Sequence, residues 1–157
     1  MDNTLNLVIE KLKENEEIPY DLLYLADESA EAIEDYIQRG TCYVAKLNDQ
    51  VIGEYVLLPT RPFTIELVSV AIKEEYQNKG FGKQLVKHAI ETARKSPYKT
   101  MEIGTGDAGI GQLALYQKCG FTIYGVDMDF FKKYYDVSFL ENGIECRHMV
   151  RLKMDFV

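Results

Sequence analysis

The chain has 157 residues, of which 46% are hydrophobic and 27% charged, a balance typical of folded globular proteins and unlike that of disordered chains. This length fits one compact domain, and we expect residues 1–157 to form a single domain. With 18 Lys and Arg against 25 Asp and Glu, the formal net charge is −7, which disfavours general binding to nucleic acid or to anionic membrane surfaces.

The N-terminal residues and the cysteines bear on the compartment and on metals. No apolar run approaches the roughly 18 residues that span a bilayer, and the start of the chain lacks the basic flank and apolar core of a signal peptide. Cys42, Cys119 and Cys146 are odd in number and have no CxxC spacing, which argues against a disulfide framework and against a zinc site. We therefore expect a cytoplasmic protein with reduced, mostly buried thiols and no metal.

The first part of the chain predicts a β-meander that follows two short helices. In chain order, the expected elements are a strand at 5–12, helices at 19–26 and 29–38, a hairpin of strands at 42–47 and 51–58, and a strand at 63–72.

The second part alternates between helices and strands. Phe81, Leu85, Ala89 and Ala93 recur every four residues, which predicts an amphipathic helix at 80–95 laid on a sheet. We then expect a strand at 99–103, a helix from about 111 to 119, a strand at 121–126, an aromatic-rich stretch and a last strand at 147–156. A meander followed by this order favours an α+β, mixed α/β layer architecture and disfavours a doubly wound Rossmann sheet.

A glycine loop between the strand at 63–72 and the following helix is the most informative segment. Gly80 and Gly82 allow positive φ angles and close backbone approach, and the first N–H groups of the helix have no intrahelical acceptor. Such a loop suits a pyrophosphate, with Lys79 and Lys83 adding charge. Two common phosphate motifs fail here, since a dinucleotide fingerprint needs glycine where Leu85 stands and a P-loop needs glycine where Gln77 stands. The alternative is a loop whose glycines only turn the chain into the helix.

Two motifs give this loop a specific resemblance. The run Gln77-Asn78-Lys79-Gly80-Phe81-Gly82 resembles the Q/R-x-x-G-x-G/A loop of the GNAT superfamily of acyl-CoA-dependent N-acyltransferases, and Leu113-Ala114-Leu115-Tyr116-Gln117-Lys118-Cys119-Gly120-Phe121 resembles that family's second signature. The two motifs stand in the family's order, and the expected elements follow its order over nearly the whole chain. The resemblance implies a mostly antiparallel mixed sheet, splayed at its centre and flanked by about four helices. It also implies transfer of an acetyl group from acetyl-CoA to a primary amine.

The same resemblance assigns the acetyl-CoA contacts. Main-chain groups of the strand would pair with pantetheine, with the acetyl carbonyl near the N–H of Val70 or Ala71, where such donors stabilise developing negative charge. The usual polar contact from an Asn before the second motif is absent, because Gly109 stands there; Asp107 or Gln112 could replace it, although Asp107 also suits a loop or helix start. The expected acetyl-CoA-binding residues are Val68, Val70, Ile72, Gln77, Asn78, Lys79, Gly80, Phe81, Gly82, Lys83 and Gln112.

Acyl transfer to an amine needs a group that accepts a proton and a group that donates one. Glu66 is the expected general base: strict alternation gives it the face of Val68, Val70 and Ile72, where burial raises a carboxyl pKa. Some GNAT enzymes carry a glutamate at the same spacing, eleven residues before the Q/R of the loop, and the alternative is a solvated residue at the strand end. Tyr116 is the expected acid, because the family's tyrosine hydroxyl approaches the CoA sulfur.

The other nucleophilic and basic side chains are expected to be structural. His88 and His148 are the two histidines, and Cys119 has no neighbour in sequence that would lower its pKa. We therefore favour direct attack of the amine in a ternary complex over an acyl-cysteine route.

Little in the sequence names the acceptor, which we expect to be a small-molecule or peptide amine. Acidic residues at 27–35 could attract a cationic amine but also fit a solvated helix face, and the aromatic run at 130–135 fits packing or an oligomer contact better than a ligand cage. A homodimer is possible. The alternative function is a non-catalytic acetyl-CoA sensor, which would need the loop and strand but neither Glu66 nor Tyr116.

Overall fold

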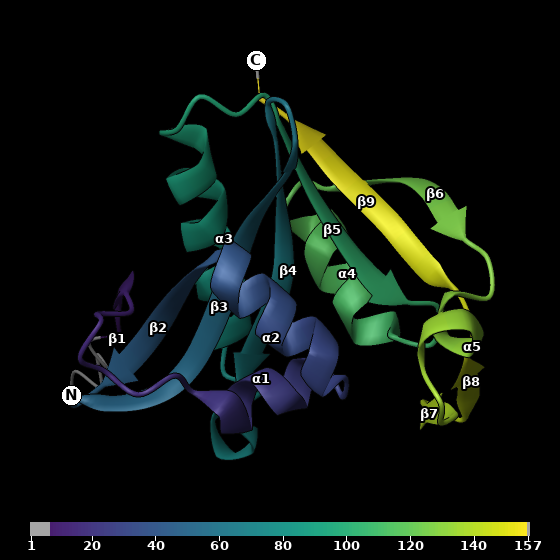
Figure 1. Cartoon of the computed structure of the whole chain (residues 1–157), viewed down its shortest axis with the longest axis horizontal. Helices are drawn as coiled ribbons and strands as arrows, with labels where there is room; N and C mark the ends of the chain where they lie inside the picture. Colours follow the sequence, from purple (N-terminus) through teal and green to yellow (C-terminus); the bar gives the residue numbers. More distant parts are fainter. Residues whose placement is uncertain (1–6, 157) are drawn as a thin grey trace.

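The computed structural model describes residues 7–156, which form a seven-stranded mixed sheet in the order β1-β2-β3-β4-β5-β9-β6 and a separate β7-β8 hairpin (Figure 1). The strands are β1 (Leu7–Lys11), β2 (Thr41–Leu47), β3 (Gln50–Arg61), β4 (Thr64–Ile72), β5 (Thr100–Gly106), β6 (Thr122–Asp127), β7 (Phe139–Glu141), β8 (Ile144–Cys146) and β9 (Met149–Asp155). The helices are α1 (Tyr20–Ala26), α2 (Ala30–Arg39), α3 (Phe81–Arg94), α4 (Ile110–Lys118) and α5 (Phe130–Tyr134), with a 3-10 turn at Glu74–Tyr76.

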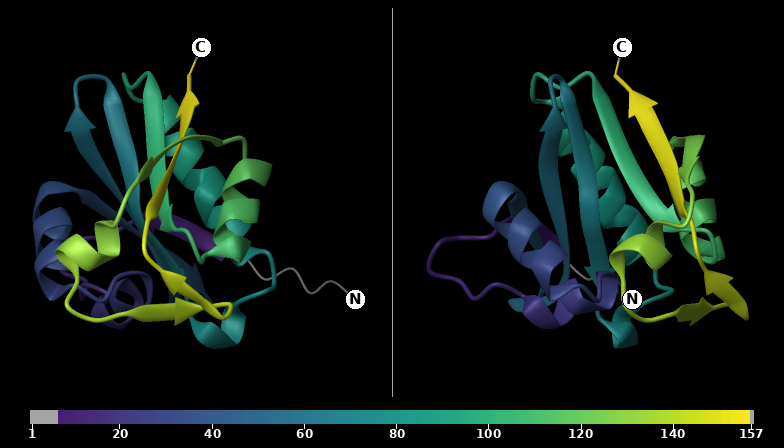
Figure 2. Two further views of the ribbon diagram at one scale, coloured as in Figure 1. Left: turned by 90° about the vertical axis from the view of Figure 1, so that its right-hand side faces the viewer. Right: turned by 45° about the vertical axis from the view of Figure 1, so that its right-hand side comes forward.

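Helices cover both faces of the sheet (Figure 2). The larger core lies beneath α3 and α4, where Leu85 and Ala89 of α3 and Tyr116 of α4 pack on the sheet. The smaller core lies on the opposite face, where Leu23 of α1 and Ile33 of α2 are fully buried. The apolar stripe that predicts α3 thus faces the sheet, as amphipathic periodicity requires.

The sheet opens between β4 and β5, its one parallel pair of neighbouring strands. Their pairing runs only from Thr64 opposite Thr100 to Leu67 opposite Ile103, although β4 continues to Ile72 and β5 to Gly106. Beyond this point the two strands diverge (Figure 1). Within residues 7–156, one edge of the second half of β4 therefore has no β partner, which is the central splay that the family resemblance implies.

A β-bulge in β4 corrects the facing expected for Glu66. Val56 of β3 lies opposite Ser69 and Leu57 lies opposite Leu67, so Val68 is an extra residue that reverses the alternation. Val70 and Ile72 pack in the larger core, whereas Val68 packs against the smaller one, the face toward which Glu66 points. The prediction that Glu66 shares a face with Val70 and Ile72 is wrong, because strict alternation assumes an unbulged strand.

Most expected elements are present, with ends displaced by a few residues. The first two residues of the strand expected at 5–12 lie outside the described residues. The aromatic-rich stretch forms α5 and the β7-β8 hairpin, so the model has five α-helices in residues 7–156 where about four were expected. None of the helices in that range is long and apolar enough to cross a membrane.

Candidate active site

The loop before α3 presents backbone N–H groups at an open surface. Asn78 and Gly80 have positive φ angles of 62° and 87°, and no side chain caps the helix start. A Cβ added at Gly80 would meet nothing within 4 Å, and one at Gly82 would meet only Leu115 at 3.9 Å. The missing side chains of these glycines therefore leave the backbone N–H groups open to solvent, where an anion can approach them closely.

The lysines of this loop remain available for such an anion. Lys79 and Lys83 are both exposed, and among residues 7–156 no carboxylate lies within ion-pair distance of either. Gln77 has a structural role as well, since its Nε2 donates to the carbonyl oxygen of Ile72 at 2.9 Å and holds the loop to the end of β4.

The free edge of β4 can be assigned by residue. The N–H of Lys73 donates to the carbonyl of Ile52 on β3. Main-chain groups of alternate residues point to the same side of a strand, so those of Ala71 also face β3. The N–H groups of Val70 and Ile72 therefore face the splay. This geometry favours Val70 over Ala71 as the donor nearest a carbonyl that enters between β4 and β5.

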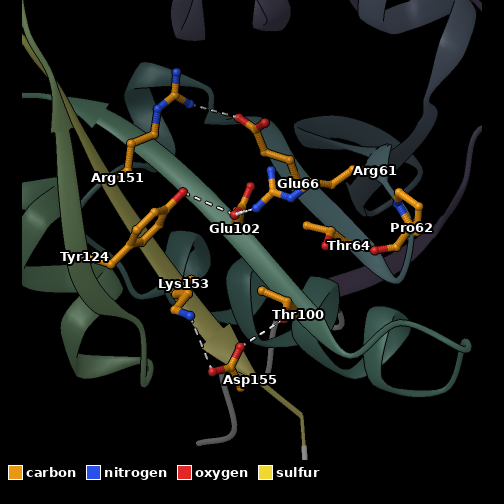
Figure 3. Close-up of polar contacts among 10 residues, drawn as sticks. All are labelled: Arg61, Pro62, Thr64, Glu66, Thr100, Glu102, Tyr124, Arg151, Lys153 and Asp155. Carbon is orange, nitrogen blue, oxygen red and sulfur yellow. Dashed lines mark hydrogen bonds and ion pairs between the residues drawn. The ribbon is translucent and has the colours of Figure 1, made fainter.

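Glu66 lies at the same splay, on the opposite face of the sheet from α3. Its side chain is 20% exposed, and its Oε2 lies 3.7 Å from Nη1 of Arg151 on β9 (Figure 3). Burial is the largest influence on the pKa of Glu66 and raises it. The positive charge of Arg151 lowers the pKa, nearby Glu102 raises it and Arg61 lowers it, and the net result is a pKa above the ordinary value. A carboxylate with a raised pKa beside an open strand edge is suited to accept a proton near neutral pH.

A second polar group surrounds Glu102 on the same face (Figure 3). Glu102 stands opposite Glu66 in the parallel register and is only 7% exposed. Its Oε2 accepts hydrogen bonds from Nη2 of Arg61 and, at 3.1 Å, from the hydroxyl of Tyr124 on β6. Glu102 is thus held by partners, whereas Glu66 has one loose ion pair.

Tyr116 and Cys119 lie on α4 in the larger core. Tyr116 is 5% exposed and its ring packs edge-on against Phe121. Burial raises the pKa of the Tyr116 hydroxyl, with a smaller contribution from Cys119, so the group stays protonated and able to donate at neutral pH. Burial also raises the pKa of the Cys119 thiol, although Lys83 and Lys87 oppose it, which disfavours a thiolate nucleophile.

Gly109, which stands in place of the family's Asn, has close neighbours on three sides. A Cβ at Gly109 would lie 2.9 Å from Oγ1 of Thr105, 3.1 Å from Oε1 of Gln112 and 3.2 Å from a backbone carbonyl. Oδ1 of Asp107 accepts from the N–H groups of Arg147 and His148 at 2.8 and 3.1 Å, which fits the alternative role of Asp107 as a loop residue. Gln112 is exposed at the start of α4 and remains the predicted polar contact.

The histidines have structural partners. Nδ1 of His88 lies 2.7 Å from the hydroxyl of Tyr55 in the larger core, and burial lowers the pKa of His88. Nδ1 of His148 accepts from the N–H of Asp129 at 2.8 Å. Neither ring is directed at Glu66.

The acidic helix and the aromatic run are mostly occupied by local contacts. On α2, Asp35 pairs with Arg39, and Glu34 accepts a hydrogen bond from Tyr20, as on a solvated helix face. The aromatic side chains contact one another, Phe130 with Phe131 at 5.2 Å between ring centroids and Phe131 with Phe139 at 5.8 Å. The rings thus pack against one another, and Phe131 and Tyr135 also line a cavity of about 490 Å³ beside the β7-β8 hairpin.

A buried carboxyl on β3, that of Glu54, is a feature that the sequence analysis missed. Glu54 is fully buried; burial raises its pKa to about 8, while the hydrogen bond that its Oε2 accepts from Ser69 of the bulge lowers it. Oε1 of Glu54 and the hydroxyl of Tyr36 have no hydrogen-bond partner within residues 7–156. Glu54, Glu102 and Arg151 belong to no motif, and their only signal in the sequence is a charge inside an apolar strand.

Metal ligands are not gathered anywhere in the described part of the chain: no group of three or more His, Cys, Asp or Glu side chains there could hold an ion. The three cysteines are free thiols, and two of them are buried.

Comparison with known proteins agrees with the splayed sheet and the loop. The model of the Acetyltransferase (GNAT) family matches residues 7–121. The uncharacterized N-acetyltransferase YvbK of Bacillus subtilis (strain 168) is 54% identical over 98% of this chain and 99% of its own. The chain belongs to the GNAT family and is an acetyltransferase.

Solved structures support the same assignment. A GNAT family acetyltransferase from Elizabethkingia anophelis with acetyl-CoA bound superposes with a TM-score of 0.94 at 45% identity, covering 96% of this chain and 99% of that one. A protein described as the IAA acetyltransferase of Bacillus cereus ATCC 14579 gives 0.92 at 51% identity with the same coverage. The expected sheet architecture and enzyme class are confirmed.

Proposed function

We propose that this chain transfers the acetyl group of acetyl-CoA to a primary amine by direct attack in a ternary complex. The observation that carries the proposal is the meeting of two features at the splay between β4 and β5. The unpaired edge of β4 borders the splay. The carboxylate of Glu66 lies beside the splay, on the face of the sheet opposite α3. The thioester and the amine would thus meet from opposite faces.

Acetyl-CoA would be held mainly by backbone groups. The pyrophosphate would accept from the N–H groups of the loop and first turn of α3, residues 77–83, with Lys79 and Lys83 balancing its charge. The pantetheine arm would pair with the free edge of β4, at Val68, Val70 and Ile72, as an added strand does. The acetyl-CoA complex of the Elizabethkingia relative makes this ligand the natural one to test.

The chemistry would then use two side chains. A lysine-type amine has a pKa near 10.4 and is mostly protonated in water, so Glu66 would take the proton that attack requires, directly or through water. The N–H of Val70 would stabilise the charge that develops on the acetyl oxygen. As the C–S bond breaks, the hydroxyl of Tyr116 would donate its proton to the leaving thiolate.

Calorimetric titration with acetyl-CoA, followed by thiol release against a panel of amines, tests the proposal. The panel should include polyamines, amino acids and peptides, and the compound abbreviated IAA in the name of the Bacillus cereus relative should be tested beside it as a separate acceptor. Binding together with thiol release on an amine is the expected result. Binding without release on any acceptor would favour the sensor, and an absence of binding would overturn the assignment of the loop.

A further inference from the structure

An arginine from the last strand reaches the expected base across an intervening strand. Arg151 lies on β9, directly opposite Gly104 of β5, and its guanidinium extends toward Glu66 on β4 (Figure 3). A Cβ at Gly104 would lie 2.8 Å from Sδ of Met149, 3.2 Å from its Cγ and 3.3 Å from Nη1 of Arg151, so the glycine makes room for both side chains of β9. Gly104 is also the first residue of β5 after the parallel pairing ends. The missing side chain therefore lets the guanidinium lie over the splay itself.

The hydrogen-bond donors of Arg151 are largely unused. Nη1 lies 3.7 Å from Glu66 and Nη2 lies 3.6 Å from Asp127, both too long for hydrogen bonds, and Arg151 donates none to any side chain within residues 7–156. Its Cζ lies 5.6 Å from the ring centroid of Phe130, which supports the plane of the group, and the side chain is 29% exposed. Arg61 differs, because Glu102 already accepts from it.

A rigid guanidinium with free donors matches a carboxylate, which it binds through two parallel hydrogen bonds. A carboxylate bound there would lie beside Glu66, so an amine on the adjacent carbon would be next to the base. Building on the proposed function, we propose that the acceptor is an α-amino acid, with its carboxylate held by Arg151 and its amine presented to Glu66.

The charges around the site are compatible with such a ligand. Glu66, Glu102 and Asp127 each lie within ion-pair distance of Arg61 or Arg151, which offset much of their charge. Arg151 holds the pKa of Glu66 below the value that burial alone would give. A bound carboxylate would neutralise Arg151 and make Glu66 a stronger base, so that the correct acceptor would itself promote proton removal.

The test compares amino acids with their decarboxylated amines. Thiol release would be measured for phenylalanine and phenethylamine, lysine and cadaverine, and glutamate and 4-aminobutyrate, with amino-acid amides and a dipeptide to distinguish a carboxylate from a neutral carbonyl. In the wild type, kcat/KM should favour at least one amino acid over its amine by about 10–100-fold, the size expected for a charge-assisted pair. Arg151→Gln should lower kcat/KM for the amino acid by about 10–100-fold more than for the amine, so that the preference disappears; because the two substrates are compared within one variant, any effect of the lost charge on Glu66 cancels.

Arg94→Gln is the matched control, because Arg94 also lies over a phenylalanine, Phe156 at 5.0 Å, and beside a glutamate, Glu91, but on α3, on the face of the sheet opposite Glu66. It should leave both substrates unchanged. Arg151→Lys keeps the charge without the fork and should recover only part of the preference.

Three results would overturn the proposal. The first is a wild-type kcat/KM for the decarboxylated amines that equals or exceeds that for the amino acids. The second is an equal fall in kcat/KM for both substrates in Arg151→Gln, and the third is no thiol release with any amino acid. If Arg151→Gln does not fold, the wild-type comparison and Arg151→Lys still decide. Thiol release on amines alone would overturn the α-amino acid acceptor and keep the acetyltransferase, whereas failure to bind acetyl-CoA would reject the proposed function itself.

Discussion

At the scale of single residues, the proposed chemistry depends on two side chains that must begin the reaction in opposite protonation states. In the proposed mechanism Glu66, half-buried beside Arg151, must begin the reaction as the carboxylate, whereas Tyr116, buried in the larger core, must begin it protonated so that it can donate to the thiolate. Burial raises the pKa of both groups. For the carboxyl this brings the pKa closer to the working pH, and for the phenol it keeps the proton in place.

Replacing Tyr116 by Phe should lower kcat by roughly 10²-fold, because the thiolate would then leave without a proton donor. The ring remains and its contact with Phe121 is preserved, so the fold should be unchanged. Steady-state thiol release gives kcat, and thermal unfolding provides the control for the fold. An unchanged kcat would show that another group donates the proton.

Replacing Glu66 by Gln should remove the acidic limb of the pH–rate profile. In the wild type the active form is the carboxylate, so kcat/KM should rise as pH increases through the raised pKa of Glu66 and level off above it. The neutral amide cannot accept the proton, and the residual rate should be low and lack this limb. A variant that keeps the same acidic limb would exclude Glu66 as the base.

At the scale of elements, a helix start and a bulged strand place the binding groups. Gly80 begins α3 in the left-handed region, which leaves the first N–H groups of the helix without side-chain caps. In β4, the extra residue Val68 directs Glu66 to one face and Val70 to the other. Ser69 of the bulge donates to the buried Glu54 at 2.9 Å, which ties the bulge to β3.

Substituting Gly82 by Asp should abolish measurable acetyl-CoA binding, because a carboxylate would stand at the site of the pyrophosphate. Gly82→Ala is the matched variant: its Cβ has room in the protein, where the nearest atom is Leu115 Cδ2 at 3.9 Å, so it separates charge from bulk. Calorimetry measures both affinities. Unaltered binding by Gly82→Asp would show that the pyrophosphate lies elsewhere.

Substituting Glu54 by Gln should change how stability depends on pH. The folded protein holds a proton on Glu54 up to about pH 8, whereas the unfolded chain releases it near the ordinary value of 4.5. Glu54 therefore makes the free energy of unfolding fall as pH rises between these values. Relative to the wild type, Glu54→Gln should gain on the order of a few kcal/mol between pH 5 and pH 8, measured by urea denaturation. A pH-independent difference would mean that Glu54 is ionised in the folded state.

At the scale of the whole molecule, the sheet consists of two parts joined by a short parallel contact. Strands β1 to β4 form one part and β5, β9 and β6 the other, and only four register pairs of β4 and β5 connect them. A ligand that lies along β4 and also meets α4 near Gln112 would bridge the two parts. Acetyl-CoA should therefore stabilise the molecule as a whole.

Acetyl-CoA at about 100 times its Kd should raise Tm by roughly 5–10 °C, since such saturation contributes about 2.7 kcal/mol to a domain of this size. Differential scanning fluorimetry measures the shift. Gly82→Asp should show none, while Tyr116→Phe should keep most of it. A shift of equal size in Gly82→Asp would indicate binding outside the proposed site.

The sequence by itself determined the parts that depend on neighbouring residues. The loop at 77–82, the amphipathic periodicity of α3 and the spacing from Glu66 to Gln77 are local, so they indicated the family, the candidate base and the candidate anion site. Only the tertiary structure decided the rest. The face of Glu66 depended on one extra residue in β4, and the approach of Arg151 depended on β9 inserting between β5 and β6, opposite a glycine. Strand order and register arise from pairing between distant segments, and no local pattern records which strands become neighbours.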